Sequence, residues 1–161
     1  MAIRNVRVLG DEILTKKSKE VKEMTPKIKE LIGDMLDTMY DHEGVGLAAP
    51  QVGILKRIVV IDISEEGNDP IVLINPEVIS TSGEQMGSEG CLSVPGKVGM
   101  VKRPNVAKVR ALDENMEEFE IEGEELLARA LLHETDHLDG KLYVDLVEGE
   151  LYNTEEFVEE E

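Results

Sequence analysis

The sequence predicts an α+β fold, because segments with helical periodicity stand at both ends of a series of short β-branched segments. A helix, several antiparallel strands and a second helix form this pattern. The 161 residues are enough for one core, and no repeat, linker or change in composition divides them. We therefore expect a single domain over residues 1–161.

The first helix is expected over residues 26–42. Thr25 can cap its N-terminus, Pro26 suits its first turn, and Gly44 marks its end. Apolar residues recur along this segment at helical spacing, and we interpret them as core residues: Ile28, Leu31, Ile32, Met35, Leu36 and Met39.

Strands are expected over residues 57–64 and 70–80, which are β-branched runs between turn residues. Residues 106–121 predict a hairpin, because apolar residues alternate on both sides of the turn sequence DEN. Helical periodicity returns over residues 124–138, with Gly140 as the expected C-cap.

The composition limits the classes of function. A net charge of −18 argues against a polyanionic partner such as nucleic acid. The chain has no apolar run of the roughly 20 residues that span a membrane and no visible secretory signal. A single cysteine suits a reducing compartment, so we expect a cytoplasmic protein. The acidic segment from about residue 150 to 161 is expected to be a solvated, partly frayed tail.

The sequence HETDH places two imidazoles on one helix face. His133 and His137 are four residues apart and can chelate one metal ion. Glu134 stands beside the first ligand, where it can take a proton from water at the metal. Ala130 and Leu126 continue the same face and form an apolar wall. The alternative is a helix with two surface histidines and acidic neighbours.

A third metal ligand must come from elsewhere in the chain. Cys91, within EGCLSVPG, would complete a His2Cys set and leave a fourth position for water. As an alternative, it is a small buried hydrophobic residue. His42 at the end of the first helix is a further candidate, as are three acids downstream of the motif: Asp139, Asp145 and Glu148.

A segment rich in small residues, GVGLAAPQVG, covers residues 44–53. Small residues allow a ligand to approach the backbone, and the amide of Gln51 can donate a hydrogen bond to an oxyanion. A glycine-rich turn before a strand would look much the same. The segment lacks the spacing of a phosphate-binding loop, so a nucleotide site is not expected.

Three blocks, GVGLAAPQ, EGCLS and HETDHLDG, resemble in order and spacing the three signature motifs of peptide deformylases. The resemblance implies an α+β fold in which antiparallel sheets pack around a central C-terminal metal-binding helix. It implies that Cys91, His133 and His137 are the metal ligands. The reaction implied is removal of the N-formyl group from the initiator methionine of nascent polypeptides, with release of formate.

The resemblance also assigns roles to further residues. Glu134 would be the general acid and base, while Gln51 and the backbone amide of Leu92 would stabilise the oxyanion. Gly46, which follows Val45, would bind the substrate backbone. We expect the methionine side chain to lie in a pocket of three apolar residues: Val45, Leu126 and Ala130.

The family generally uses Fe(II) in the cell and accepts zinc, nickel or cobalt. The expected partners are N-formylmethionyl nascent peptides, and we expect a monomer. Some members dock near the ribosomal exit tunnel through a basic C-terminal helix, but the acidic end of this chain argues against that route. We further expect Glu89 to pair with a cation such as Arg103 and thereby support the Cys91 segment.

The sequence departs from the family pattern at two positions near the motifs. Leu132 stands where many members have glutamine, which affects packing and not chemistry. The segment GKVGM follows the second block where some members carry an arginine, and Lys97 or the loop backbone would take its place. Two other classes stay open: an HExxH-type zinc endopeptidase, with a third ligand downstream of His137, and a non-enzymatic metal-binding domain.

Overall fold

The computed structural model describes residues 3–153 and contains two α-helices and two antiparallel sheets. The helices are α1 (Pro26–Asp41) and α2 (Leu126–Leu138). The strands are β1 (Gly46–Ala48), β2 (Ile58–Ile61), β3 (Ile71–Ser82), β4 (Gln85–Cys91), β5 (Val94–Arg103), β6 (Val106–Leu112), β7 (Glu118–Glu124) and β8 (Val147–Asn153). Three short 3-10 helices complete the set: η1 (Glu12–Thr15), η2 (Ala49–Val52) and η3 (Tyr143–Asp145).

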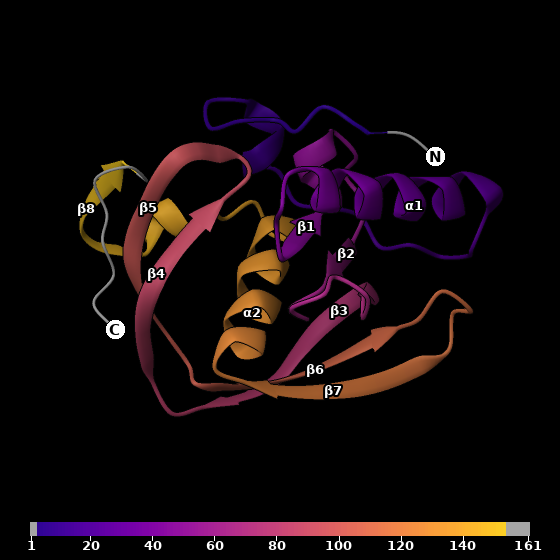
Figure 1. The fold of residues 1–161 in the computed structure, drawn as a ribbon. Helices are drawn as coiled ribbons and strands as arrows, with labels where there is room; N and C mark the ends of the chain where they lie inside the picture. The colour runs from indigo at the N-terminus through magenta and orange to yellow at the C-terminus, as the bar shows by residue number, and fades with distance from the viewer. Residues whose placement is uncertain (1–2, 154–161) are drawn as a thin grey trace.

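Helix α2 lies in the middle of the molecule, between the two sheets (Figure 1). One sheet has five strands in the order β1-β2-β3-β6-β7, and the other has three in the order β4-β5-β8. Helix α1 lies against the side of the five-stranded sheet that faces away from α2. This arrangement confirms the predicted α+β class with antiparallel sheets around a C-terminal helix.

Strand β2, which lies between β1 and β3, is apolar throughout because both faces of its sheet are covered. Ile58 and Val60 belong to the cluster that packs on α1, while Val59 and Ile61 belong to the cluster that packs on α2. All four residues are buried. The alternation of side chains along a strand thus divides the core into two layers on either side of one sheet.

Helix α1 begins as predicted but ends in an unexpected way. The hydroxyl of Thr25 accepts a hydrogen bond from the amide of Ile28 at 3.2 Å, and Pro26 is the first helical residue. At the C-terminal end, the residue in the left-handed region is Glu43, with φ 56°, and not the glycine that follows it. The amide of Gly44 donates to the carbonyl of Met39 at 2.9 Å, which closes the helix.

Residues 85–103 form a hairpin that the sequence analysis did not identify. Strands β4 and β5 pair from Gln85↔Arg103 to Gly90↔Val98, and Cys91 is the last residue of β4. Four glycines and a proline in this stretch lower its β-propensity, so it has the composition of a loop. The pairing is therefore set by the surrounding structure.

The third strand of this sheet, β8, corrects a prediction. It pairs with β5, with Val147 opposite Val101 and Tyr152 opposite Val98. Residues 150–153 were expected to belong to a partly frayed tail, and that expectation was wrong for them. Their backbone is held by the ladder, although most side chains of the strand are exposed. The rest of the predicted tail lies outside the described residues.

Helix α2 begins two residues later than predicted, because residues 122–124 extend β7. Gly140 follows the C-cap residue and has φ 76°. A Cβ atom at this position would lie 2.4 Å from the carbonyl oxygen of Thr15, so only glycine fits. No helix within residues 3–153 is long and apolar enough to cross a membrane.

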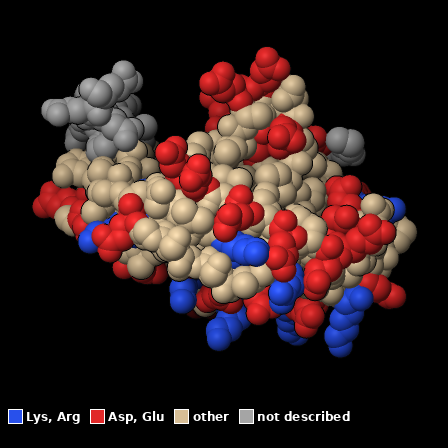
Figure 2. Space-filling view, turned by 90° about the horizontal axis from the view of Figure 1, so that it is seen from below, with Lys and Arg blue, Asp and Glu red and all other residues tan. Residues whose placement is uncertain are grey.

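Acidic side chains cover much of the surface seen in Figure 2, in line with the net charge of −18. Lysine and arginine side chains are fewer and gather mainly along one edge of this view. The face seen in Figure 2 therefore offers no broad basic surface to a polyanion.

Candidate metal centre

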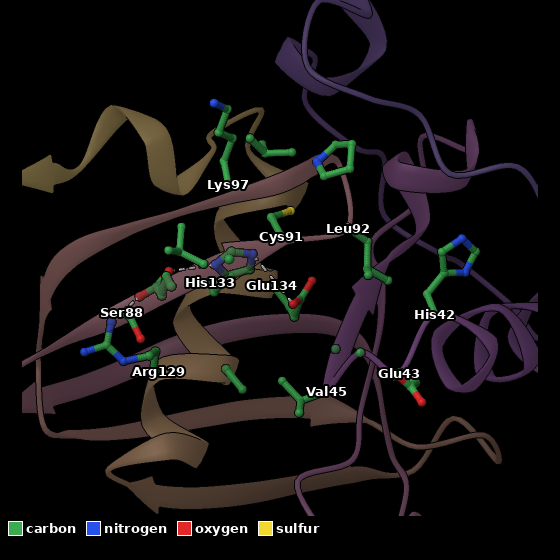
Figure 3. A pocket seen from close by; sticks show the side chains of 18 of the residues that line it. His42, Glu43, Val45, Ser88, Cys91, Leu92, Lys97, Arg129, His133 and Glu134 are labelled. Atoms are coloured by element: carbon green, nitrogen blue, oxygen red, sulfur yellow. Dashed lines mark hydrogen bonds and ion pairs between the residues drawn. The ribbon is translucent and has the colours of Figure 1, made fainter. Parts of the chain in front are cut away.

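A cavity of about 570 Å³ lies beside α2 (Figure 3). Its walls come from the end of α1, from β1, from the β4–β5 hairpin and from α2. All of the predicted site residues except His137 line it: Val45, Gly46, Gln51, Cys91, Leu92, Leu126, Ala130, His133 and Glu134. The three sequence blocks therefore meet at one place.

Cys91, His133 and His137 converge beside this cavity. The Nε2 atoms of the two histidines are 3.3 Å apart, and the Sγ atom of Cys91 lies 3.4 Å from Nε2 of His137. A tetrahedral ion with bonds of about 2.0–2.1 Å to nitrogen and about 2.3 Å to sulfur has ligand separations of about 3.3 Å and about 3.5 Å. The three donor atoms therefore fit one ion.

The hydrogen bonds of His133 show which nitrogen faces the other ligands. Its Nδ1 atom lies 2.7 Å from Oε1 of Glu89 and donates to this carboxylate, so Nε2 is the ring nitrogen that faces His137. Burial and the neighbouring His133 lower the pKa of His137, which favours its neutral form. The nitrogens of two buried histidines and the sulfur of half-buried Cys91 face one another, and together they form a site for a cation.

The other candidates for the third ligand lie elsewhere or have other partners. The carboxylate of Asp139 accepts a hydrogen bond from Arg57 at 3.1 Å. The Nδ1 atom of His42 lies 2.9 Å from the carbonyl of Thr38, at the end of α1. Within residues 3–153, the one group of three or more potential ligand side chains is the Cys91 group. A ligand downstream of His137, as the endopeptidase alternative requires, is not supported.

The predicted pair between Glu89 and Arg103 is present. The guanidinium donates from Nε to Oε2 at 2.8 Å and from Nη2 to Oε1 at 2.9 Å. A third nitrogen, Nη1, donates to Asp136 at 2.8 Å. Burial alone would raise the pKa of Glu89, but hydrogen bonds from Arg103 and His133 hold it well below its usual range. An ionised Glu89 then fixes the orientation of His133.

Glu134 points toward the metal ligands from the same helix. Its Oε2 atom lies 3.9 Å from Nε2 of His133, and its Oε1 atom is buried without a hydrogen-bond partner among the described residues. Burial raises the pKa of Glu134 to about 7. A carboxyl group with this pKa can both accept and release a proton near neutral pH.

Gly46 provides the space that Glu134 occupies. A Cβ atom at position 46 would lie 2.5 Å from Oε2 and 2.8 Å from Cγ of Glu134. The family resemblance implies that Gly46 binds the substrate backbone, and the structure adds a second reason for a glycine. Any side chain here would displace the carboxylate from its position beside the metal ligands.

Gln51 is buried and directed toward the sulfur of Cys91. Its Oε1 atom accepts a hydrogen bond from the amide of Ala48 at 2.9 Å. Its Nε2 group donates to the hydroxyl of Ser93 at 3.0 Å and faces Sγ of Cys91 at 3.4 Å. The side-chain amide is thus held with its donor group toward the metal ligands.

The predicted apolar pocket residues line the cavity together. Val45 and Leu126 are about half exposed, at 45% and 48%, whereas Ala130 is buried. In Figure 3 the Val45 side chain lies below Glu134, between Arg129 and Glu43 in this view. Lys97 also lines the cavity, although its ammonium group donates to the side chain of Asn153.

Two residues of the site were not identified from the sequence. Arg129 donates to Glu89 at 2.5 Å, and Tyr143 stacks on the ring of His133 with centroids 5.9 Å apart. Arg129 stands one helical turn before His133, so its charge in the otherwise apolar first half of the helix was a usable signal. The place of Tyr143 depends on tertiary packing, and its sequence neighbourhood gives no sign of it.

Comparison with known proteins agrees with this site. The model of the polypeptide deformylase family matches residues 3–151. A peptide deformylase of Lachnoclostridium phytofermentans is 66% identical over 161 residues, which are 100% of this chain and 99% of that protein. A peptide deformylase of Agathobacter rectalis is 65% identical over 153 residues, 95% of each chain.

Solved structures of peptide deformylases have the same fold as this chain. A crystal structure of a peptide deformylase from Legionella pneumophila has a TM-score of 0.88 and 49% identity, and the match covers 91% of this chain and 86% of that one. The family match spans most of the chain, the curated relatives match along nearly their full length, and the motif residues meet around one set of metal ligands. On these grounds the chain belongs to the polypeptide deformylase family.

Proposed function

We propose that this protein is a metal-dependent hydrolase that removes the N-formyl group from the initiator methionine of nascent polypeptides and releases formate. One observation carries the proposal: Cys91, His133 and His137 direct their donor atoms to one point beside a cavity that also holds Glu134. When bound there, a divalent cation supplies a Lewis acid that activates water and polarises a carbonyl group.

Glu134 is assigned the role of general acid and base. It accepts a proton from the attacking water and delivers it to the amine that leaves with the peptide. The position of its carboxylate, 3.9 Å from Nε2 of His133, supports this role, as does the Oε1 atom that has no partner among the described residues.

Gln51 and the backbone amide of Leu92 are assigned to the oxyanion that develops on the formyl group. The Gln51 side chain is fixed by the amide of Ala48 and directs its donor group toward Cys91, which supports this role. A donor that is held in place before the reaction costs no reorganisation when charge develops. Leu92 follows Cys91 directly and lines the same cavity.

The methionine side chain is assigned to the part of the cavity between Val45, Leu126 and Ala130, and the backbone of Gly46 is assigned to the substrate backbone. Methionine is flexible and apolar, so a pocket of aliphatic side chains suits it. The half-exposed Val45 and Leu126 would gain contacts when the substrate binds.

Fe(II) is the proposed metal in the cell, and zinc, nickel or cobalt can take its place. A set of two imidazoles and one thiolate suits iron and zinc alike. The protein is proposed to act as a single-domain monomer in the cytoplasm on N-formylmethionyl nascent peptides. Any proximity to the ribosome would not depend on a basic C-terminal segment, because this end of the chain is acidic.

The test is a comparison of two reactions of one metal-loaded preparation. We expect the protein, purified anaerobically with Fe(II), to release formate from formyl-Met-Ala-Ser and to leave the internal bonds of an unblocked peptide intact. Glu134→Ala should bind the metal like the wild type but lose at least about 100-fold in turnover. A metal-loaded wild type that releases no formate would overturn the proposed function.

A further inference from the structure

We propose that Arg129 is a positioning residue of the metal centre: its guanidinium holds the carboxylate of Glu89, which in turn orients the ligand His133. This inference rests on the proposed function, because it concerns the metal on which that function depends. It assigns no contact between Arg129 and the reacting atoms.

Arg129 connects three elements that meet at the site. From α2, its Nη1 group donates to Oε2 of Glu89 on β4 at 2.5 Å and to the carbonyl of Val101 on β5 at 3.2 Å. Its Nη2 group donates to the side-chain oxygen of Gln85, also on β4, at 3.3 Å. The residue is 7% exposed, so these contacts are shielded from water.

The two oxygens of Glu89 have different neighbours. Oε1 accepts from His133 at 2.7 Å and from Arg103, while Oε2 accepts from Arg103 and Arg129. A carboxylate held at both oxygens cannot rotate away from the imidazole. Arg129 therefore restrains the oxygen that His133 does not contact.

Charge balance gives Arg129 a role that Arg103 does not fill. Arg103 divides its contacts between two carboxylates, Glu89 and Asp136. Arg129 also donates to two neutral oxygens, those of Val101 and Gln85. The two arginines together balance the two acids, whereas Arg103 alone would leave this group with one excess negative charge beside His133.

The strand next to Arg129 leaves space for its guanidinium. A Cβ atom at Gly87 would lie 2.9 Å from Nη2 and 3.3 Å from Cζ of Arg129. The φ angle of Gly87 is not in the left-handed region, so its backbone does not require glycine. The missing side chain makes room for the arginine, which gives a second way to disturb Arg129 without replacing it.

Two other roles for Arg129 predict a different result for metal affinity. The residue also lines the cavity, so it would be only a wall of the substrate pocket if the Glu89 contact had no effect on the metal. It would be only a structural link if it joined the hairpin to α2 without an effect on His133. Metal affinity, measured on folded protein, separates the proposed role from both.

The experiment compares Arg129→Met, which keeps an apolar wall, with Arg129→Lys, which keeps a donor and a charge. Zinc affinity is measured by competition with a chelator, and the visible spectrum of the Co(II)-loaded protein reports the ligand geometry. We expect Arg129→Met to weaken zinc binding by about 10- to 100-fold and to change the spectrum. Arg129→Lys should recover part of the affinity, because lysine can still donate to Glu89.

Arg110→Met is the matched control, since Arg110 is a half-exposed arginine that pairs with Glu120 on the neighbouring strand, away from the cavity. It should leave zinc affinity unchanged. In the metal-saturated Arg129→Met protein, kcat for formyl-Met-Ala-Ser should fall more than KM rises, because ligand orientation affects the reaction more than binding.

Gly87→Ala supplies a second, independent variant. It should weaken zinc binding in the wild-type background but have little further effect in the Arg129→Met background, because it acts through the arginine. Equal effects in both backgrounds would contradict the proposal.

Unchanged zinc affinity in folded Arg129→Met would overturn the proposal, whether the variant raises KM or lowers the melting temperature. The zinc measurement does not depend on turnover. If the wild type binds metal but releases no formate, the proposed function fails, and the order of zinc affinities still decides the role of Arg129.

Discussion

The five-stranded sheet meets α2 through apolar side chains, whereas the three-stranded sheet meets it through buried charged groups. Val59, Ile61 and Leu73 of the first sheet pack in one cluster with Leu131 and Leu138 of the helix. The apolar cluster of the second sheet contains no α2 residue. The contacts of the second sheet with the helix include ion pairs of Glu89 with Arg129 and His133, and of Arg103 with Asp136.

This difference explains where the metal ligands come from. Apolar contacts are non-directional and fix the distance between layers more than the angles of side chains. Charged hydrogen bonds fix orientation as well. The metal centre takes two ligands from α2 and one from β4. It therefore lies at the charged contact between α2 and the three-stranded sheet, which we call the charged joint. The contact between α2 and the five-stranded sheet is the apolar joint.

The largest effect is expected from Glu89→Gln, which breaks the charged joint. The substitution leaves buried Arg129 without a carboxylate partner in the described part of the chain and replaces the charged acceptor of His133 by a neutral amide. Unfolding free energy should fall by about 3–5 kcal/mol, and metal affinity of the folded protein by about 10- to 100-fold. Chemical denaturation and chelator competition measure the two quantities. A variant that loses stability but keeps its metal affinity would show that the charged joint does not support metal binding.

Leu73→Ala should break the apolar joint and leave the metal alone. Leu73 is 1% exposed in the cluster between β3 and α2, so its truncation should cost about 2–5 kcal/mol of unfolding free energy. Denaturation curves give this value, and zinc affinity at low temperature should equal that of the wild type. Loss of zinc affinity would show that the two joints are not independent.

Gly46→Ala tests the space beside Glu134 at the edge of the five-stranded sheet. The new Cβ would lie 2.5 Å from Oε2, so the carboxylate must move. Displacement by about 1 Å is expected to lower turnover by roughly 100-fold, with little change in metal content. Steady-state kinetics with formyl-Met-Ala-Ser measure the loss. Turnover within twofold of the wild type would mean that Glu134 need not occupy this position.

Tyr40→Phe gives the smallest effect, because it removes one charged hydrogen bond away from both joints. The hydroxyl of Tyr40 donates to Asp62 at 2.6 Å. Burial alone would raise the pKa of Asp62, but hydrogen bonds from Ser64 and Tyr40 lower it to about 2. The hydrogen bond should contribute about 1.5 kcal/mol to stability when Asp62 is ionised.

The pH dependence of this contribution has a defined sign. Because the folded pKa of about 2 lies below the ordinary aspartate pKa of 3.8, the contribution is present above pH 3.8. It is lost as pH falls through about 2. The difference in unfolding free energy between wild type and Tyr40→Phe should shrink over that range, as urea denaturation at a series of pH values would show. A difference that stays constant would contradict the assignment.

The two joints also differ in how well they could be predicted. Strand β2 and both helices follow from periodicity and capping residues, because apolar packing leaves a regular pattern in the sequence. The β4–β5 hairpin does not, since its glycines and Pro95 resemble a loop. Strand β8 was missed because its acidic composition favours a tail, and its pairing with β5 is a tertiary contact.

The residues of the site also divide into those that the sequence predicts and those that it does not. His133, Glu134 and His137 follow from spacing on one helix. Cys91 remained one of several candidates until the resemblance to a family was considered. The predicted Glu89–Arg103 pair was found, but Arg129 was missed, because an arginine on a helix is more often exposed. Only the fold shows that it is buried between α2 and the hairpin.

The central claim is that one ion joins the two layers through ligands from both, and a titration of the metal-free protein with Co(II) tests it most directly. We predict one Co(II) per chain, with a thiolate-to-cobalt charge-transfer band in the near ultraviolet. Cys91→Ala should lose this band and bind Co(II) more weakly. An unchanged spectrum in Cys91→Ala would contradict the claim, because the hairpin would then supply no ligand to the metal.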